Sequence, residues 1–346
     1  MYFLIGGIAG IVAVVLITAW ILLRRRKSRR NLPPEKAALD YSLSVAEEYA
    51  CPKISNEDIL LATDNLSTSN YIGQGIAGKV YRGTLSTGEH VAVKHIVNDG
   101  QLETFMREVK SVSHIRHPNL VTLLGYSNFV DNNKEECFLV YELCHNGNLY
   151  QWLYSKSKEG LVLSWIQRLE IAIDSARGLW FLHTYPQGCI VHRDIKPQNI
   201  LIDASFQAKL SDFGLSKVMD MDQSHVVSEV RGTFGYVDPE YRNDSRVYAS
   251  ADVYSFGMVL LQLLSARRVI DMNSNRPMNL SQMARFLTRQ GNLSEFADPK
   301  LQGEYSLEAF DLVFKLALSC TGIKEQRPSM EQVVQKLERA HQISYF

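Results

Sequence analysis

Residues 189–203 read CIVHRDIKPQNILID, and in this stretch two apolar runs flank a polar loop. Short apolar runs bounded by polar residues predict buried strands, so the loop would be anchored at both ends. Between the anchors lie a carboxylate at Asp194, an ammonium group at Lys196 and an amide at Asn199. The sequence therefore predicts that three chemically different polar groups are held close together on one short loop.

This combination suits phosphoryl transfer, because catalysis of that reaction consists mostly of positioning and charge neutralisation. Asp194 would take the proton of the attacking hydroxyl group. Lys196 would lie near the moving phosphoryl group, and Asn199 would hold Mg²⁺ through its amide oxygen. The alternative is a surface loop with ordinary charges, so the rest of the chain has to decide between the two.

The segment YIGQGIAGKVY at residues 71–81 contains glycines with the spacing GxGxxG. This spacing occurs in dinucleotide-binding turns and in hairpins that cover phosphates. A dinucleotide-binding fold needs a helix directly after the glycines, whereas residues 79–94 show a strand, a turn at residues 86–88 and a second strand. We therefore expect the glycines to lie in a hairpin over the phosphates of ATP.

The second strand of this hairpin ends in VAVK, so that Lys94 can face the α- and β-phosphates. A helical pattern over residues 102–113 places Glu108 beside apolar side chains. We expect Glu108 to pair with Lys94 and to hold it on the phosphates. The residues expected to bind ATP are Ile72, Gly73, Gln74, Gly75, Ile76, Ala77, Gly78, Lys79, Val80, Lys94 and Glu108.

A second carboxylate, Asp212, follows in the sequence KLSDFG at residues 209–214. Magnesium prefers oxygen ligands, so Asp212 and Asn199 can hold this ion between phosphates. The expected cofactors are therefore ATP and Mg²⁺, with Mn²⁺ as the alternative ion.

The polar segment at residues 215–237 carries three hydroxyl groups that we consider as phosphorylation sites, Ser224, Ser228 and Thr233. Arg193 brings a positive charge to the loop described above. A phosphate on the segment would neutralise that charge and order the segment, which is a recurring switch. Alanine at all three positions should then lower the reaction rate.

The first 23 residues contain no charged side chain, and RRRKSRR follows them at residues 24–30. Such a run is long enough to cross the roughly 30 Å hydrocarbon layer as one helix, and the basic cluster should stay in the cytosol. A cleaved signal peptide would need a basic segment before a shorter apolar run; a buried core helix is the other alternative. We expect a transmembrane helix at residues 1–23, a basic juxtamembrane linker at residues 24–69 and almost nothing outside the cell.

Charge and cysteine content narrow the class of protein. The chain has 37 basic and 37 acidic residues, and this balance argues against a nucleic-acid partner. Its five cysteines show no CxxC pair, so we interpret them as reduced thiols of a cytosolic domain.

Strand patterns dominate residues 70–141 and helical patterns dominate residues 145–340, which predicts two lobes with a cleft at residues 142–144. Within the first lobe, two further strands at residues 120–126 and 138–141 are expected, with a polar loop between them at residues 128–136. Helices are expected at residues 56–62, 102–113, 148–154 and 164–184, and beyond residue 248.

Two features of the second lobe are expected to serve the fold. The very apolar helix at residues 258–264 would form the pillar of this lobe. Arg327 would form a buried bidentate ion pair with Glu240.

From about Tyr71 to Leu337 the chain resembles the eukaryotic protein kinases, because GQGIAGKV, VAVK, HRDIKPQN, DFG and VDPE occur in this order. The resemblance implies an α+β, two-lobed protein-kinase fold at residues 70–340, preceded by the transmembrane helix. A small N-lobe with an antiparallel sheet and one main helix would cover about residues 70–141, and a large helical C-lobe about residues 145–340.

The same resemblance assigns roles to residues. It implies that Asp194 is the catalytic base, that Lys196 acts near the γ-phosphate, and that Asn199 and Asp212 are the metal ligands. The lysine in DIKPQN is similar to serine/threonine kinases rather than to tyrosine kinases, which usually have a different residue there.

Finer features resemble the plant receptor-like kinases of the Pelle type. They are ATDNLSTSNYIGQG at residues 62–75, RGTFGYVDPEY at residues 231–241, DVYSFG at residues 252–257, and Tyr141 at the back of the ATP pocket. The sequence departs from that pattern at Ala77, where the glycine loop usually has an aromatic tip, and in the absence of a large ectodomain before the span.

This resemblance implies a single-pass protein of the plasma membrane with a cytosolic kinase domain. It would transfer the ATP γ-phosphate to serine or threonine of itself and of cytosolic proteins in receptor-type signalling. Its expected partners are protein substrates, the lipid bilayer and a ligand-binding co-receptor. The alternative is a kinase-fold adaptor or co-receptor that acts by binding partners; because Lys94, Asp194 and Asp212 are all present, the enzyme is favoured.

Overall fold

The computed structural model describes residues 51–75, 78–96, 102–131, 134–154, 161–220, 223–271, 278–290 and 293–345. The chain divides into two compact units, Met1–Ala50 and Cys51–Phe346, and all of the described residues belong to the second. The expected transmembrane helix and residues 24–50 of the expected linker lie outside the described residues. Within the part of the chain that is described, none of the helices combines the length and the apolar character needed to cross a bilayer.

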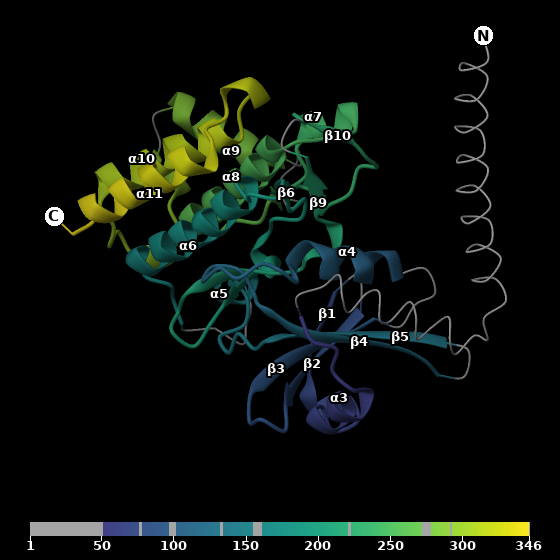
Figure 1. Ribbon diagram of the computed structural model, residues 1–346. Helices are drawn as coiled ribbons and strands as arrows, with labels where there is room; N and C mark the ends of the chain where they lie inside the picture. The colour runs from purple at the N-terminus through teal and green to yellow at the C-terminus, as the bar shows by residue number, and fades with distance from the viewer. Residues whose placement is uncertain are drawn as a thin grey trace, which may run out of the picture. The chain divides into compact units, whose positions relative to one another are not determined.

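The N-lobe is built on a five-stranded antiparallel sheet with the strand order β1-β2-β3-β5-β4, drawn in Figure 1 in the purple to blue part of the chain. Two helices, α3 (Asn56–Ala62) and α4 (Leu102–Val112), accompany it. The strands are β1 (Tyr71–Gly75), β2 (Gly78–Thr84), β3 (His90–Ile96), β4 (Leu123–Asp131) and β5 (Lys134–Glu142).

The alternation of β3 decides which side chains enter the core and which enter the cleft. Successive side chains of a strand point to opposite faces. Val91 and Val93 are fully buried in a cluster that includes Ile59 of α3. Lys94 points to the other face, where it meets Glu108 of α4. The expected pairing of these two charged residues therefore follows from one strand with period two and one helix packed on its polar side.

The expected loop at residues 128–136 is wrong, because most of it belongs to strands. Phe129 lies opposite Glu136, and Asn128 lies opposite Cys137. The rings of Phe129 and Phe138 are stacked, with centroids 6.1 Å apart and planes inclined by 8°. The sheet edge can carry polar residues on its solvent side, so the low hydrophobicity of this segment concealed a long hairpin.

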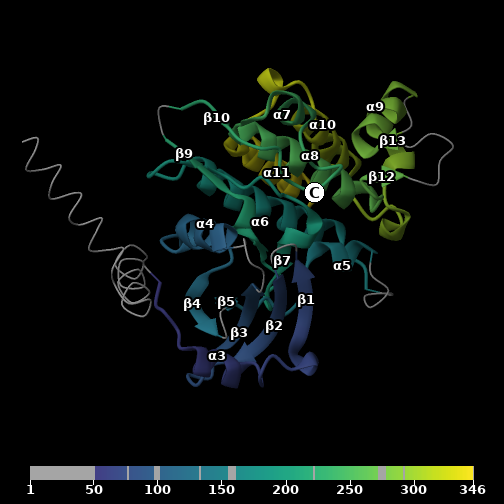
Figure 2. The same cartoon turned by 90° about the vertical axis from the view of Figure 1, so that its right-hand side faces the viewer.

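The C-lobe is mostly helical and lies at the other end of the described unit in both Figure 1 and Figure 2. Helix α6 begins with a capping box in which Ser164 and Gln167 exchange hydrogen bonds with each other's backbone. The helices are α5 (Leu149–Tyr154), α6 (Trp165–His183), α7 (Pro239–Asp244), α8 (Ala249–Ser265), α9 (Leu280–Gln290), α10 (Leu307–Cys320) and α11 (Met330–Ile343).

Short strand pairs and 3-10 turns connect these helices. The pairs are β6 (Cys189–Val191) with β9 (Lys217–Met219), β7 (Ile200–Ile202) with β8 (Ala208–Leu210), β10 (Val226–Val227) with β11 (Arg246–Val247), and β12 (Ile270–Asp271) with β13 (Met278–Asn279). The turns are η1 (Thr68–Asn70), η3 (Pro197–Asn199), η4 (Phe213–Leu215), η5 (Leu293–Phe296), η6 (Pro299–Leu301) and η7 (Lys324–Gln326).

Helix α8 is the centre of the C-lobe, as its apolar sequence predicts. Every residue from Ala251 to Ser265 is buried. A helix that is apolar all round has to be surrounded by other elements, and α6 and α10 both pack against it. The helix therefore supplies a fixed platform for the loops that reach its N-terminal end.

The expected ion pair between Arg327 and Glu240 is only partly right. The bidentate partner of Arg327 is Asp238, with Nη1–Oδ2 and Nη2–Oδ1 distances of 2.5 and 2.9 Å. Glu240 makes a single contact of 3.2 Å. Asp238 precedes Pro239 at the start of α7 and is fully buried, whereas the Glu240 side chain is 39% exposed. The buried N-cap carboxylate is therefore the one that takes the fork of the guanidinium.

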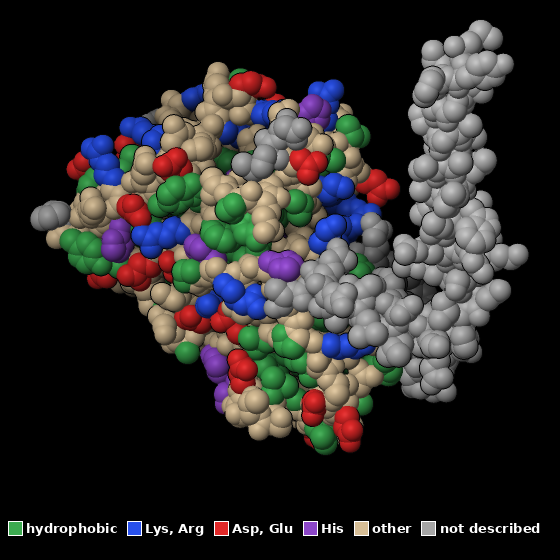
Figure 3. Space-filling model, viewed as in Figure 1, with side chains coloured by type: hydrophobic (Ala, Val, Ile, Leu, Met, Phe, Trp, Pro, Cys, Tyr) green, Lys and Arg blue, Asp and Glu red, His purple; other side chains and the backbone are tan. Residues whose placement is uncertain are grey.

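Charged side chains of both signs are scattered over the face drawn in Figure 3, with apolar side chains between them. This distribution matches the equal numbers of acidic and basic residues in the sequence. All five cysteines are free thiols, as their spacing predicts.

Candidate active site

The loop between β6 and β7 is tied to the N-terminal end of α8. The carboxylate of Asp252 accepts hydrogen bonds from the backbone N–H groups of His192 (2.7 Å) and Arg193 (2.8 Å). Asp252 is fully buried and also lies 3.0 Å from Nε2 of His183. Burial raises the pKa of Asp252, but the hydrogen bonds and charge of His183 outweigh this, so its pKa lies below the usual value. In the sequence, Asp252 is only the first residue of DVYSFG, one of the stretches that carry the family resemblance; nothing there predicts this contact, which only the fold creates.

Asp194 lies at the centre of a small hydrogen-bond network. Its Oδ2 accepts from Nζ of Lys196 at 2.6 Å and from Nδ2 of Asn199 at 3.0 Å. Its Oδ1 accepts from the hydroxyl of Thr233 at 2.6 Å. Lys196 also donates to the hydroxyl oxygen of Thr233 at 2.7 Å. The structure thus brings together the three groups that the loop sequence predicts, and it adds Thr233, considered before only as a phosphorylation site.

Lys94 connects both lobes through two carboxylates. Its Nζ lies 2.9 Å from Oε2 of Glu108 and 2.7 Å from Oδ1 of Asp212. Burial lowers the pKa of Lys94, but the carboxylates of Asp212 and Glu108 outweigh this and raise its pKa above the usual value. The ammonium group is therefore held in its charged form, buried between a carboxylate of each lobe.

Tyr141 supports this arrangement from β5. Its hydroxyl donates to Oε1 of Glu108 at 2.5 Å, and both side chains are buried. Burial raises the pKa of the Tyr141 hydroxyl well above the usual value, so it acts as a donor. The resemblance placed Tyr141 at the back of the ATP pocket, but sequence reasoning did not anticipate its contact with Glu108.

Asp212 stands at a strained point of the backbone. Its φ of +65° lies in the left-handed region, which costs energy for a residue with a side chain. Burial raises the pKa of its carboxyl, but Lys94 outweighs this and the pKa lies below the usual value. The neighbouring Phe213 is fully buried and its ring lies 5.0 Å from that of His192. The strained turn therefore brings the carboxylate to Lys94, while the next side chain anchors the turn.

The donor set at Asn199 and Asp212 fits a hard divalent cation. The amide nitrogen of Asn199 donates hydrogen bonds to the backbone carbonyl and to the carboxylate of Asp194. The amide oxygen of Asn199 remains as an acceptor. Oδ1 of Asp212 meets Lys94, and none of the described residues donates to its Oδ2. The two residues are linked through Ser211, whose backbone N–H donates to the carbonyl of Asn199 at 2.9 Å. An amide oxygen and a carboxylate oxygen are ligands of the kind that Mg²⁺ accepts.

The glycine-rich hairpin lies next to Lys94 in the sheet. Gly73 pairs with Val80, and Val80 pairs with Lys94 in the register of β1, β2 and β3. A Cβ atom at Gly78 would lie 2.0 Å from the carbonyl oxygen of His95, so only glycine fits there. The expected ATP-binding residues Ile72, Gly73, Gln74 and Gly75 lie in β1, and Gly78, Lys79 and Val80 lie in β2; Ile76 and Ala77 lie outside the described residues.

Arg193 faces the segment that follows η4. Its Nη1 lies 3.4 Å from the hydroxyl of Ser228, and its Nη2 donates to the carbonyl of Glu229 at 3.0 Å. Burial lowers the pKa of Arg193, while Tyr241, whose ring lies 5.8 Å from the guanidinium, raises it in part; the net shift is downward. In the described part of the chain, no carboxylate lies within 4.0 Å of it. Ser228 is therefore the expected phosphorylation site nearest to this guanidinium, while Ser224 bonds to His225.

The family model of the protein kinase domain matches residues 66–337. A probable receptor-like protein kinase of Arabidopsis thaliana is 41% identical over 285 residues, which are 81% of this chain and 58% of that protein. A probable receptor-like serine/threonine-protein kinase of the same plant is 39% identical over 290 residues, 82% of this chain and 65% of that protein. The nodulation receptor kinase of Pisum sativum is 38% identical over 315 residues, 89% of this chain and 34% of that protein.

This chain thus spans less than two thirds of the length of each of these relatives. The expected fold, an antiparallel-sheet N-lobe followed by a helical C-lobe, is confirmed by the sheet order and by the extent of the family match. A kinase domain uses ATP and a divalent metal in general. The chain therefore belongs to the protein kinase family, and its relatives are receptor-like kinases of plants.

Proposed function

We propose that this protein is a serine/threonine kinase that phosphorylates itself and cytosolic proteins in receptor-type signalling. The observation that carries the proposal is the position of Asp194, whose carboxylate is held by Lys196, Asn199 and Thr233. These contacts hold both oxygens of the carboxylate in one orientation. Preorganised polar groups of this kind supply most of the catalysis in phosphoryl transfer.

The residues of the chain divide the work between binding and proton transfer. Bound ATP supplies the phosphoryl group, and Mg²⁺, or Mn²⁺ as the alternative, neutralises its charge. Lys94 orients the nucleotide, and Glu108 holds Lys94 in place. Asp194 accepts the proton of the substrate hydroxyl, while Lys196 keeps a positive charge 2.6 Å from that carboxylate. Asn199 and Asp212 hold the metal through oxygen atoms.

Phosphorylation of the segment between η4 and α7 is the proposed regulation. Ser228 is the best candidate, because a phosphate there would lie beside the guanidinium of Arg193. Thr233 is the weakest, because its hydroxyl is bonded to Asp194, and a phosphate would set two negative charges against each other. Ser224 is exposed and contacts His225, so it carries less expected effect on the site.

The membrane anchor and the partners are part of the same proposal. The uncharged run at residues 1–23 and the basic residues after it support a single span in the plasma membrane with the kinase domain in the cytosol. The names of the relatives, which are receptor-like kinases, support a role beside a ligand-binding co-receptor. An adaptor without catalysis is disfavoured, since Lys94, Asp194 and Asp212 are all present.

The test is autophosphorylation of the full chain with Mg-ATP, with modified residues mapped by mass spectrometry. We expect phosphate on serine and threonine, including Ser228, and none in an Asp194→Asn variant. Replacing Mg²⁺ with Mn²⁺ tests the choice of metal. If neither the unchanged protein nor a Ser228→Asp variant incorporated phosphate, the result would contradict the kinase function and support the adaptor.

A further inference from the structure

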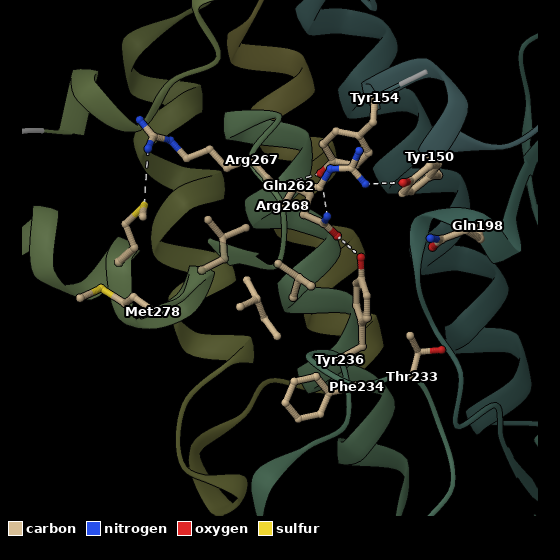
Figure 4. A pocket seen from close by; sticks show the side chains of 14 residues that line it. Tyr150, Tyr154, Gln198, Thr233, Phe234, Tyr236, Gln262, Arg267, Arg268 and Met278 are labelled. Carbon is tan, nitrogen blue, oxygen red and sulfur yellow. Dashed lines mark hydrogen bonds between the residues drawn. The ribbon is translucent and has the colours of Figure 1, made fainter. Parts of the chain in front are cut away.

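A pocket of about 630 Å³ lies on the C-lobe, next to the network around Asp194. Figure 4 shows Thr233 and Phe234 at one end of this pocket and Arg268 with Tyr150 and Tyr154 at the other. Thr233 belongs to both places, since its hydroxyl donates to Asp194 at 2.6 Å. A polypeptide whose hydroxyl reaches Asp194 would therefore have this pocket directly beside it.

The charge of the pocket has one sign. Among its described lining residues only Arg267 and Arg268 are charged, and both side chains are exposed. In the part of the chain that the structure describes, no carboxylate lies within 4.0 Å of either guanidinium, although exposed arginines elsewhere form such pairs. Arg177, for example, lies 2.6 Å from Glu338. Both guanidinium groups of the pocket are therefore available to bind an anionic ligand.

Both arginines are held in place by neutral groups. The guanidinium of Arg268 lies over the ring of Tyr154, 4.4 Å from its centroid, and donates to the hydroxyl of Tyr150. Arg267 donates to the carbonyl of Glu295 at 3.1 Å, and its own carbonyl accepts from the hydroxyl of Tyr154 at 2.7 Å. A cation that is already oriented loses less conformational freedom when it binds an anion.

The end of the pocket near Thr233 can contact the rest of a polypeptide. Phe234 is 75% exposed, the highest value among the exposed large hydrophobic side chains of the described residues. Gln198, beside Asn199 in the chain, also lines the pocket and is uncharged. Apolar contact at Phe234 and positive charge at Arg267 and Arg268 together suit a segment that has an acidic side chain a short distance from its hydroxyl residue.

We propose that Arg267 and Arg268 select protein substrates with an aspartate or glutamate close to the serine or threonine that is phosphorylated. This inference rests on the proposed kinase function and names its substrate class. A lysine or arginine at that position of the substrate would meet two cations of like charge, and a neutral residue would gain neither attraction nor repulsion. Two exposed ion pairs should together favour the acidic substrate by about tenfold.

The experiment compares three peptides of one sequence that differ at the positions flanking a single serine, which are all Glu, all Gln or all Lys. The full chain is used, and kcat/KM is measured for each peptide at low salt. We expect the order Glu, Gln, Lys, with about tenfold between Glu and Gln. The preference should shrink as salt is raised, because exposed charges are screened.

The variant is Arg267→Gln with Arg268→Gln, and the readout is the ratio of kcat/KM for the Glu and Gln peptides. That ratio should fall to about one. Arg268→Lys keeps the charge, so it should retain most of the preference. The matched control is Arg289→Gln, an exposed arginine of α9 that does not line the pocket, and its ratio should equal that of the unchanged protein.

Direct binding of the same peptides, followed by fluorescence anisotropy, separates the two proposals. An active kinase with equal kcat/KM for the Glu and Gln peptides, or with a ratio that the double variant does not change, would overturn the substrate preference alone. A protein that shows no kinase activity but still binds the Glu peptide more tightly, and loses this preference in the double variant, would contradict the kinase function and support the binding of acidic segments at Arg267 and Arg268.

Discussion

Two buried clusters of this protein have the same charge pattern, one cation between two carboxylates. In the cleft, Lys94 lies between Glu108 and Asp212, at 2.9 and 2.7 Å. In the C-lobe, Arg327 lies between Asp238 and Glu240, with closest contacts of 2.5 and 3.2 Å. Charge alone does not distinguish them.

What distinguishes them is how fully each cation is used. Arg327 also donates to the carbonyls of Gly322 and Ser250 at 3.0 Å, and its side chain is 1% exposed. All the N–H groups of its guanidinium already donate hydrogen bonds, so it cannot bind another partner. Lys94 is a point charge on a flexible stem, and its partner Asp212 is 35% exposed. The Arg327 cluster therefore fixes the fold, whereas the Lys94 cluster can exchange a contact for a phosphate.

The largest effect should come from breaking the Arg327 cluster. Arg327→Ala leaves Asp238 buried without its cation, and we expect a loss of about 3–5 kcal/mol in the free energy of unfolding. Denaturant unfolding measures it. Arg177→Ala, which removes the exposed pair with Glu338, is the control and should cost less than about 1 kcal/mol. Equal losses in the two variants would contradict the distinction between the clusters.

Removing the cation of the cleft should act mainly on catalysis. Lys94→Met should lower kcat/KM by a factor of about 10²–10³, or about 3–4 kcal/mol of transition-state stabilisation. Its loss of folding stability should be smaller than that of Arg327→Ala for two reasons. Asp212 is 35% exposed and can be solvated, and burial raises the pKa of Glu108, so this buried carboxyl can take up a proton when its cation is removed. Lys315→Met, at an exposed surface pair, serves as the control. A variant that unfolds as readily as Arg327→Ala would show that the cleft cluster also holds the fold.

A milder substitution tests whether Tyr141 stabilises the cluster of Lys94, Glu108 and Asp212. Tyr141→Phe removes the donor to Oε1 of Glu108 without changing the shape of the core. We expect a loss of about 1–2 kcal/mol in stability, since the acceptor is charged and buried. Thermal unfolding measures it, and Tyr345→Phe, at an exposed tyrosine, is the control. No difference between these two variants would mean that Lys94 alone holds Glu108.

Acid should weaken the cleft through Asp212. Burial raises the pKa of this carboxyl, but Lys94 brings it below the usual value of 3.8. The stabilisation is therefore complete above that value and is lost as the pH falls through the lower pKa of the folded state. Because the side chain is 35% exposed, the effect should be about 1 kcal/mol or less.

The check is the acid dependence of the unfolding midpoint between about pH 2 and pH 5. An Asp212→Asn variant should show a shallower decline than the unchanged protein. The exposed Asp220 provides the control substitution to Asn. If Asp220→Asn flattened the curve as much as Asp212→Asn, the contact with Lys94 would not be its cause.

Much of the candidate site could be predicted, because its parts lie close together in the chain. The loop sequence brought Asp194, Lys196 and Asn199 together, and they do share one network. The predicted hairpin and helix placed Lys94 beside Glu108, which the structure bears out at 2.9 Å. These predictions depended on local periodicity and on motif spacing, which short segments carry within themselves.

What the sequence determined by itself was a strand-rich first lobe followed by a helical second lobe, the set of reactive groups and the apolar stretch within α8. Only the tertiary structure decided that Thr233 bonds to Asp194, that Asp252 fixes the loop 60 residues before it, and that Arg327 takes Asp238 rather than Glu240. The reason is physical. A partner far away in the chain is chosen by burial and by the direction of a backbone turn, and both depend on how all the elements pack together.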